Sequence, residues 1–150
     1  MNRGFTIIEI LTVVTILGIF AALAAPSMAD LLAATAVRGA ATDFYSSLIA
    51  ARSEAIKRRA NATVAPVGAD WTTGWTVKVS GNTFQQVDKL KPRVVVSPTT
   101  PTPIVYGTNG RVISPVGITT IKFSDSVRTT VANRCVIVGT SGLPAVRQGC

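Results

Sequence analysis

Few side chains in this sequence of 150 residues belong to types that do chemistry, and those few lie far apart. The chain has no histidine, which excludes histidine metal sites and the serine–histidine and cysteine–histidine dyads. Asp70, Asp88 and Asp125 fall in separate expected loops as surface residues, so they do not predict the converging oxygen ligands that calcium needs. Glycine motifs that bind nucleotide phosphates are also missing. We therefore expect no enzyme activity, no catalytic residues, no metal site and no cofactor.

The two tryptophans, Trp71 and Trp75, could stack on nucleic-acid bases. Large aromatic side chains gain more from burial, and packing in a core is their more frequent use. We therefore expect both indole rings to lie in the core beside a helix.

Glu9 is the one charged side chain in an apolar run of 21 residues, from 5 to 25. A helix of that length spans about 31 Å, enough for the hydrocarbon core of a bilayer. A carboxylate there costs roughly 2.5–3.5 kcal/mol near the bilayer centre and less near an end. The run could be a secretory signal peptide cleaved around residues 22–24, a passive anchor, or a signal cleaved before the apolar run. Glu9 favours the third alternative, because the other two have no use for the charge.

The apolar run is expected to lead into an amphipathic helix. Apolar residues at spacings of three and four share one face of this helix: Val37, Ala41, Phe44, Leu48, Ala51 and Ala55. The charged side chains of Arg38, Asp43, Arg52 and Lys57 fall outside that face. This pattern predicts that the helix buries one side against the rest of the chain.

Two features mark the interior and the end of this long helix. Gly18 and Pro26 predict a kink or local melting between residues 18 and 26, because proline lacks an N–H and clashes with the preceding turn. Three basic residues at 57–59 are expected to close the helix, where positive charge complements the C-terminal dipole.

After Asn61 the sequence changes to short apolar or alternating segments separated by turns. Residues 75–79 and 83–87 flank Ser80-Gly81-Asn82 and predict a β-hairpin. Further strands are predicted over residues 63–65, 94–96, 104–106, 110–113, 120–123 and 135–138. Residues 97–103 hold three prolines and predict a loop, and the residues from 143 onward are expected to form a tail. A long helix followed by seven or eight strands predicts an α+β fold, with antiparallel sheets on the second half of the helix.

The first 26 residues resemble the N-terminus of type IV pilins and type II secretion pseudopilins. Gly4 and Phe5 match the family's cleavage position, Glu9 matches its glutamate five residues into the mature chain, and Pro26 matches a proline further on. The resemblance implies a leader over residues 1–4, a hydrophobic transmembrane and assembly helix over 5–29, and a globular pilin-like domain over 30–150. It also implies cleavage by prepilin peptidase between Gly4 and Phe5. The new α-amine of Phe5 would pair with Glu9 of a neighbouring subunit.

The rest of the chain resembles the GspH/FimT branch of that family. The resemblance lies in residues 51–58 (ARSEAIKR), in Trp71 with Gly74-Trp75, and in residues 108–112 (TNGRV). It implies a long helix packed on two small antiparallel sheets. It also implies a minor subunit that acts with other major and minor pilins or pseudopilins. The location would be the inner membrane, with one span and the globular domain in the periplasm, and then a filament.

The charge of the chain is +8, and residues from 31 onward hold 14 basic and 5 acidic side chains, a net +9. Such a surface favours nucleic acid, anionic lipid or acidic partners, or serves solubility alone. We expect a minor pilin in the initiation or tip complex of a type IV pilus. The alternatives are a minor pseudopilin of type II secretion and a pilus-tip subunit that binds DNA.

The DNA-binding alternative depends on the C-terminal arginines. DNA-binding members of the branch carry a Gly-Arg-x-Arg motif in the tail, whereas residues 142–147 here hold a single arginine, Arg147. Arg134 and Arg147 flank the cysteines and are the candidate DNA contacts, which a disulfide would bring near each other. Two such contacts predict at most weak, salt-sensitive and non-specific binding.

Cys135 and Cys150 are the two cysteines of the chain. In a domain expected beyond the inner membrane a disulfide between them is favoured, and free thiols or an intermolecular bridge are the alternatives. A closed loop of this length is worth ~3 kcal/mol in the chain-entropy model. The bridge would hold the C-terminus against a strand.

Overall fold

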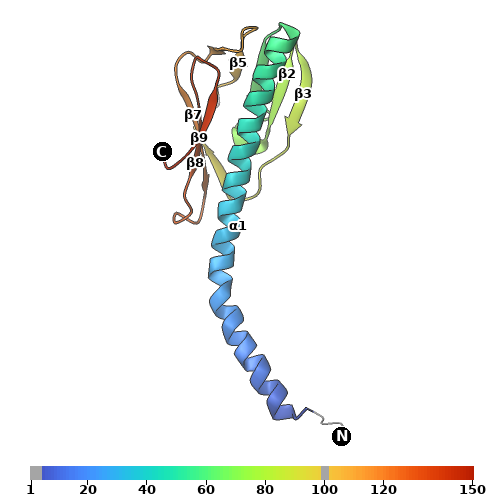
Figure 1. The fold of residues 1–150 in the computed structure, drawn as a ribbon, viewed down its shortest axis with the longest axis vertical. Helices are drawn as coiled ribbons and strands as arrows, with labels where there is room; N and C mark the ends of the chain where they lie inside the picture. Colours follow the sequence, from blue (N-terminus) through green and yellow to red (C-terminus); the bar gives the residue numbers. More distant parts are fainter. Residues whose placement is uncertain (1–4, 99–101) are drawn as a thin grey trace. The chain divides into compact units, whose positions relative to one another are not determined.

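The structure is a computed structural model that describes residues 5–98 and 102–150 (Figure 1). This part of the chain contains one α-helix, α1 (Ile7–Arg58), a short 3-10 helix, η1 (Trp71–Thr73), and nine strands. The strands are β1 (Ala62–Pro66), β2 (Trp75–Val79), β3 (Asn82–Val87), β4 (Val94–Ser97), β5 (Ile104–Tyr106), β6 (Val112–Ser114), β7 (Thr119–Asp125), β8 (Arg134–Val138) and β9 (Pro144–Gln148).

The chain divides into two compact units, residues 1–32 and residues 33–150. In the first unit, α1 holds an exposed apolar stretch long enough, by length and composition, to cross a membrane. Gly18 and Pro26 predict a kink or local melting, and of these the melting is not present, because the helix is unbroken between residues 18 and 26. The alanines and leucines around Pro26 are strong helix formers, which offsets the single hydrogen bond that proline removes.

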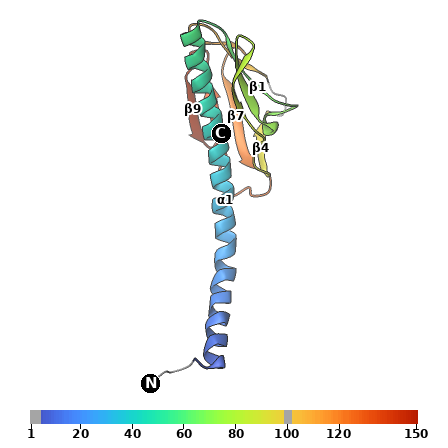
Figure 2. The ribbon, with the colours of Figure 1, turned by 90° about the vertical axis from the view of Figure 1, so that its right-hand side faces the viewer.

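The second unit is α+β, as predicted, with two antiparallel sheets on the C-terminal half of α1. One sheet has the order β3-β2-β1-β5-β6 and the other has the order β4-β7-β8-β9. Figure 1 shows β2 and β3 on one side of this half of α1, with β7, β8 and β9 on the other, and Figure 2 shows β1, β4 and β7 beside the helix from a second direction.

The predicted hairpin is confirmed. Val79 of β2 pairs with Asn82 of β3, so the loop consists of Ser80 and Gly81. Both loop residues have positive φ, at 50° and 82°. This is the backbone of a two-residue hairpin turn, which follows the right-handed twist of the flanking strands.

The core forms where the apolar face of α1 meets both sheets. All six apolar residues predicted to share that face are at most 1% exposed. Phe44 lies at the centre, with its ring edge-on to Trp71 and Trp75 at 5.1 Å and tilted against Phe123 at 5.7 Å. The prediction that both tryptophans pack in the core is confirmed, since Trp71 and Trp75 are fully buried. The indole Nε1 of Trp75 also donates to Ser47 Oγ at 2.9 Å.

The turns at Gly110 and Gly142, which come from different sheets, meet backbone to backbone near the end of α1. A Cβ atom on Gly142, where φ is +79°, would lie 2.0 Å from the carbonyl oxygen of Gly110. That same oxygen accepts a hydrogen bond from Arg52 Nε of α1 at 3.1 Å. Glycine at 142 therefore permits a contact that fixes both sheets to the helix at one point.

The C-terminal tail differs from the prediction. Residues 144–148 form β9, which pairs with β8 from Arg134↔Gln148 to Val138↔Pro144. This strand begins with a proline and lies at the edge of its sheet, where the missing N–H removes no interior hydrogen bond. A second difference is smaller: β6 begins at Val112, two residues later than the predicted strand.

Candidate functional site

The first turn of α1 holds the side chains predicted to serve assembly. Gly4 lies outside the described residues, and Phe5 is 78% exposed just before the helix. The Thr6 carbonyl oxygen accepts from Ile10 N, and Thr6 Oγ1 accepts from the backbone N–H of Glu9, each at 3.3 Å. Thr6 is therefore the N-cap of α1, and Glu9 occupies the third helical position. Only the threonine half of a capping box is formed among the described residues, because the Glu9 side chain does not accept from Thr6 N.

Glu9 lies on an exposed apolar surface. An open depression beside it is lined by Phe5, Ile10, Val13 and Val14. No side chain among residues 5–98 and 102–150 donates a hydrogen bond or forms an ion pair to its carboxylate. A negative charge in the first turn is favoured by the helix dipole, and both carboxylate oxygens are available to a further donor.

The other polar side chains of the apolar segment differ from Glu9. The hydroxyl of Thr12 donates to the carbonyl of Ile8 at 2.8 Å, and that of Thr15 donates to the carbonyl of Leu11 at 2.7 Å. These hydroxyls satisfy their hydrogen-bonding capacity within the helix, which lowers the cost of placing them in lipid. The Glu9 carboxylate thus differs from the two threonine hydroxyls, because its hydrogen-bond donor must come from outside its own helix.

In the second unit, Cys135 and Cys150 are joined by a disulfide, with their Cα atoms 6.4 Å apart. Cys135 lies on β8 and is fully buried. Cys150 follows β9, whose pairing with β8 brings the end of the chain back to Cys135. The bridge therefore ties the edge strand β9 to the interior of its sheet.

The two candidate DNA contacts, Arg134 and Arg147, lie on neighbouring strands but on opposite faces of the sheet. Arg134 pairs with Gln148, whereas Arg147 pairs with Cys135, one position further along. Successive side chains of a strand point to opposite faces, so the two guanidinium groups diverge. The two residues are thus close along the paired strands, as expected from the disulfide, but the alternation of side chains places their guanidinium groups on different faces.

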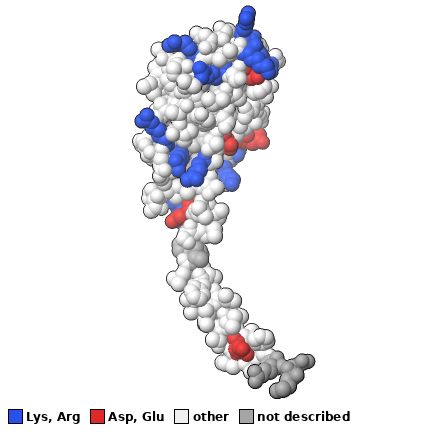
Figure 3. All heavy atoms as spheres, in the orientation of Figure 1, with Lys and Arg blue, Asp and Glu red and all other residues white. Residues whose placement is uncertain are grey.

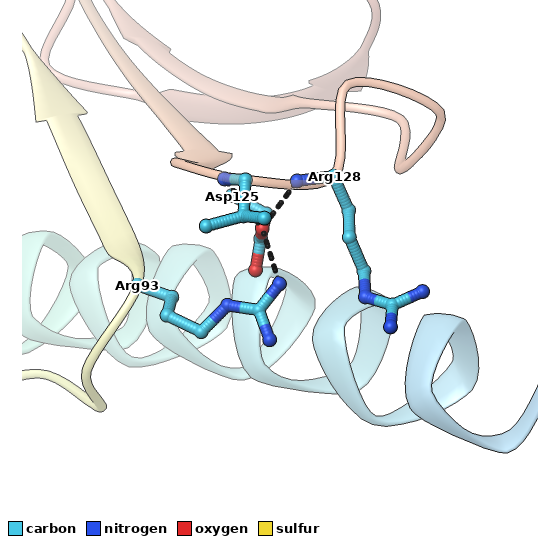
Figure 4. A network of polar contacts seen from close by, with 4 residues as sticks. Arg93, Asp125 and Arg128 are labelled. Atoms are coloured by element: carbon cyan, nitrogen blue, oxygen red, sulfur yellow. Dashed lines mark hydrogen bonds and ion pairs between the residues drawn. The ribbon is translucent and has the colours of Figure 1, made fainter. Parts of the chain in front are cut away.

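Asp125, expected on the surface, lies at the end of β7 as a half-buried residue whose carboxylate is covered by a network of donors. Its side chain is 3% exposed. Figure 4 shows its carboxylate between Arg93 and the backbone of Arg128, and it accepts from Arg128 N at 2.7 Å, Val127 N at 2.9 Å and Arg93 Nη2 at 3.3 Å. The Arg128 and Val127 N–H groups, with Arg93, hold the pKa of Asp125 below its usual value against the opposing effect of burial. The network joins β4 to the loop after β7.

We expect Asp125→Asn to destabilise the second unit at neutral pH and to have less effect in acid. The asparagine oxygen can still accept from the backbone, but the charge opposite Arg93 is lost. Because the folded pKa of Asp125 is below the unfolded value of about 3.9, its contribution is present above that value and is lost as pH falls through the folded pKa. The melting temperatures of the unaltered protein and of the Asp125→Asn variant are measured from neutral to strongly acidic pH. The two values should converge in acid.

A matched control for this experiment is Asp88→Asn. Asp88 is exposed and accepts from Gln86 Nε2 at 3.3 Å. A melting-temperature difference for Asp125→Asn that stays constant throughout acid titration would show that the ionised carboxylate is not the stabilising group.

The remaining carboxylates of the second unit do not gather into a site. Asp70 caps η1, where its Oδ1 accepts from Thr72 N at 2.8 Å and from the Thr72 hydroxyl. These bonds to Thr72 lower the pKa of Asp70. Glu54, 8% exposed, pairs with Arg58 and Lys57 at the end of α1. In the part of the chain that the structure describes, no three His, Cys, Asp or Glu side chains form a metal-ligand group.

Solved structures provide one comparison for this arrangement. The type IV minor pilin FimU of Pseudomonas aeruginosa strain PAO1 has a similar fold in two crystal forms. The P21 form is 20% identical, with a TM-score of 0.61 over 76% of this chain and 88% of that chain. The P65 form is 20% identical, with a TM-score of 0.60 over 75% of this chain and 92% of that chain. At this identity the likeness establishes the fold. No curated protein matches the chain.

Two families match the sequence in separate parts. Residues 1–25, which include Glu9 and most of the apolar segment, match the prokaryotic N-terminal methylation motif. Residues 40–142, which run from the buried half of α1 to the turn before β9, match the family described as type II transport protein GspH. The second match covers more than half of the chain and agrees with the helix and two sheets described above. The chain therefore belongs to the GspH family of pilin-like proteins.

Proposed function

We propose that the protein is a minor pilin, a structural subunit in the initiation or tip complex of a type IV pilus. The observation that carries this proposal is the exposed Glu9 carboxylate in the first turn of an apolar helix. The N-terminal methylation motif and the fold shared with a type IV minor pilin support it. The family match supports a second candidate, a minor pseudopilin of type II secretion.

The proposed assembly begins with processing. Prepilin peptidase would cleave between Gly4 and Phe5 while the apolar segment remains in the inner membrane and residues 30–150 fold in the periplasm. The α-amine created on Phe5 would carry a positive charge next to the cap formed by Thr6. Glu9 of one subunit and this amine of the next would form a charge-assisted pair in a medium of low dielectric constant. Other major and minor pilins are the expected partners.

DNA binding is not supported by the positions of the arginines. Arg134 and Arg147 point to opposite faces of the sheet, so they cannot hold adjacent phosphates as one site. Binding of DNA through either guanidinium alone would be weak and lost with modest salt.

The mature protein is expected to begin at Phe5 and to keep its apolar helix. Intact mass spectrometry of the protein extracted from membranes measures the start of the chain. A protein that lacks residues 1–4 and is present in pili sheared from the cell surface would support the minor-pilin proposal. A soluble product that has lost the whole apolar segment would contradict it and restore the signal-peptide alternative. Absence from sheared pili, together with a secretion defect on deletion, would favour the pseudopilin.

A further inference from the structure

The sheet β4-β7-β8-β9 has one face toward the core and one face away from it. Ile121 and Phe123 of β7 are buried, so they mark the core side. Thr120 precedes Ile121 and Lys122 follows it, so both side chains point to the opposite side. We call the side away from the core the outer face.

One row of the outer face is basic. Lys122 of β7 pairs with Cys135 of β8, and Cys135 pairs with Arg147 of β9. Cross-strand partners share a face, so Lys122 and Arg147 flank the disulfide two strands apart, about 10 Å. The described residues provide neither cation with an ion pair.

The other end of the outer face is aliphatic. The ladders end at this side with the pairs Thr119↔Val138 and Val138↔Pro144. Ile118, Gly139 and Leu143 are the next residues of the three segments, and by alternation they lie on the outer side. Ile118 is 78% exposed and Leu143 is 59% exposed. A Cβ atom on Gly139 would lie 4.0 Å from Ile118 Cγ1, so Gly139 and Ile118 lie side by side at this end of the face. Val116, in the loop two residues before Ile118, is 89% exposed.

No acidic side chain lies on this face in the described part of the chain. Of the five Asp and Glu side chains after residue 31, Asp43 and Glu54 belong to α1, and Asp70 and Asp88 lie next to strands of the other sheet. Asp125 lies two residues after Phe123 on β7, and its partner Val94 lies two residues before Val96, the partner of Phe123, so Asp125 is on the core side of the sheet. Figure 3 shows that Lys and Arg outnumber Asp and Glu on the visible surface of the globular unit, which is otherwise covered by uncharged residues.

We infer that the outer face docks a different pilin-like subunit whose own surface combines carboxylates with aliphatic side chains. This inference rests on the proposed function. The partner's carboxylates would face Lys122 and Arg147, and its aliphatic groups would cover Ile118 and Leu143. A second copy of this chain does not fit, because it would oppose the same cations with cations of its own.

DNA fits this face less well than an acidic protein. The two cations are separated by the width of two strands, which permits few phosphate contacts. The neighbouring side chains are aliphatic, and bases stack on aromatic or guanidinium planes.

The test places a photo-crosslinking amino acid at position 118 of the full-length protein, in the cells that produce it. Irradiation should link position 118 to another pilin-like subunit with a net negative globular domain. The double variant Lys122→Glu/Arg147→Glu should lower the crosslinking yield about fivefold or more, as expected for the loss of roughly 1 kcal/mol. Lys122→Arg/Arg147→Lys should keep the yield. Lys78→Glu is the matched control, because Lys78 is exposed on β2 of the other sheet.

Crosslinks are measured separately in total membranes and in sheared filaments. The minor-pilin proposal and the docking face can then fail independently of each other. A charge-dependent partner in membranes, without the chain in filaments, would support the docking face and reject the pilus assignment. A chain that enters filaments but has no charge-dependent crosslink at position 118 would overturn the docking face alone. Crosslinks to a second copy, to nucleic acid or to lipid would also overturn it.

Discussion

Phe44→Ala is expected to lower the free energy of unfolding of the second unit by about 3–5 kcal/mol, the usual cost of removing a buried aromatic ring. The ring is fully buried and makes edge contacts with both tryptophans at 5.1 Å, so its loss leaves a cavity between α1 and the two sheets. Chemical denaturation of a fragment covering residues 33–150, which contains the buried core, measures this change.

The matched control for Phe44 is Phe84→Ala. Phe84 is 44% exposed on the edge strand β3, where its ring lies 5.6 Å from the guanidinium of Arg58. Its removal exposes little core, so we expect a loss of about 1 kcal/mol or less. Equal losses for the two variants would mean that Phe44 does not join the two sheets to the helix.

Glu9→Ala is expected to leave the chain cleaved and inserted in the membrane while its incorporation into filaments falls at least about tenfold. Leaving one partner of a buried ion pair uncompensated costs about 3–5 kcal/mol, which far exceeds the 1.4 kcal/mol of a tenfold change. Insertion itself should become easier, since a carboxylate is removed from the apolar segment. Immunoblots of the membrane and sheared-filament fractions measure both effects.

Two further variants separate charge from helix structure at this site. Glu9→Gln keeps the size of the side chain and should fail like Glu9→Ala if pairing with an amine is the cause. Thr12→Val is the control, because the Thr12 hydroxyl is bonded to Ile8 within the helix. Normal incorporation of Glu9→Ala would refute the pairing with Phe5.

Most of the fold could be predicted because its elements have strong local patterns. The apolar face of α1 was visible from residue spacing alone, and the Ser80–Gly81 turn matched a known hairpin type. The edge strand β9 was missed because it begins with Pro144 and lacks a run of β-branched residues. Its position depends on pairing with β8 and on the bridge from Cys150, which are long-range constraints.

A candidate site could be predicted from the sequence only where a single residue identifies it. Glu9 was evident from its charge in an apolar segment, and the threonine three residues before it is a capping-box signature that could also have been recognised. Arg134 and Arg147 lie close to the cysteines in sequence, which predicts one site but does not say on which face of a sheet each side chain lies. Strand register decides on which face a side chain lies, and a shift of one residue reverses it. The outer face with Lys122 and Arg147 therefore became visible only with the pairing of β7, β8 and β9.

The meeting of Gly110 and Gly142 has a mechanical consequence. Two close-packed backbone turns cannot slide past each other as flexible side chains can, and Arg52 fastens one of them to α1. A pulling force applied to one sheet is thus transmitted directly to the other sheet and to the helix. Under tension the second unit should behave as a single stiff body, and stretching should concentrate in segments away from this junction.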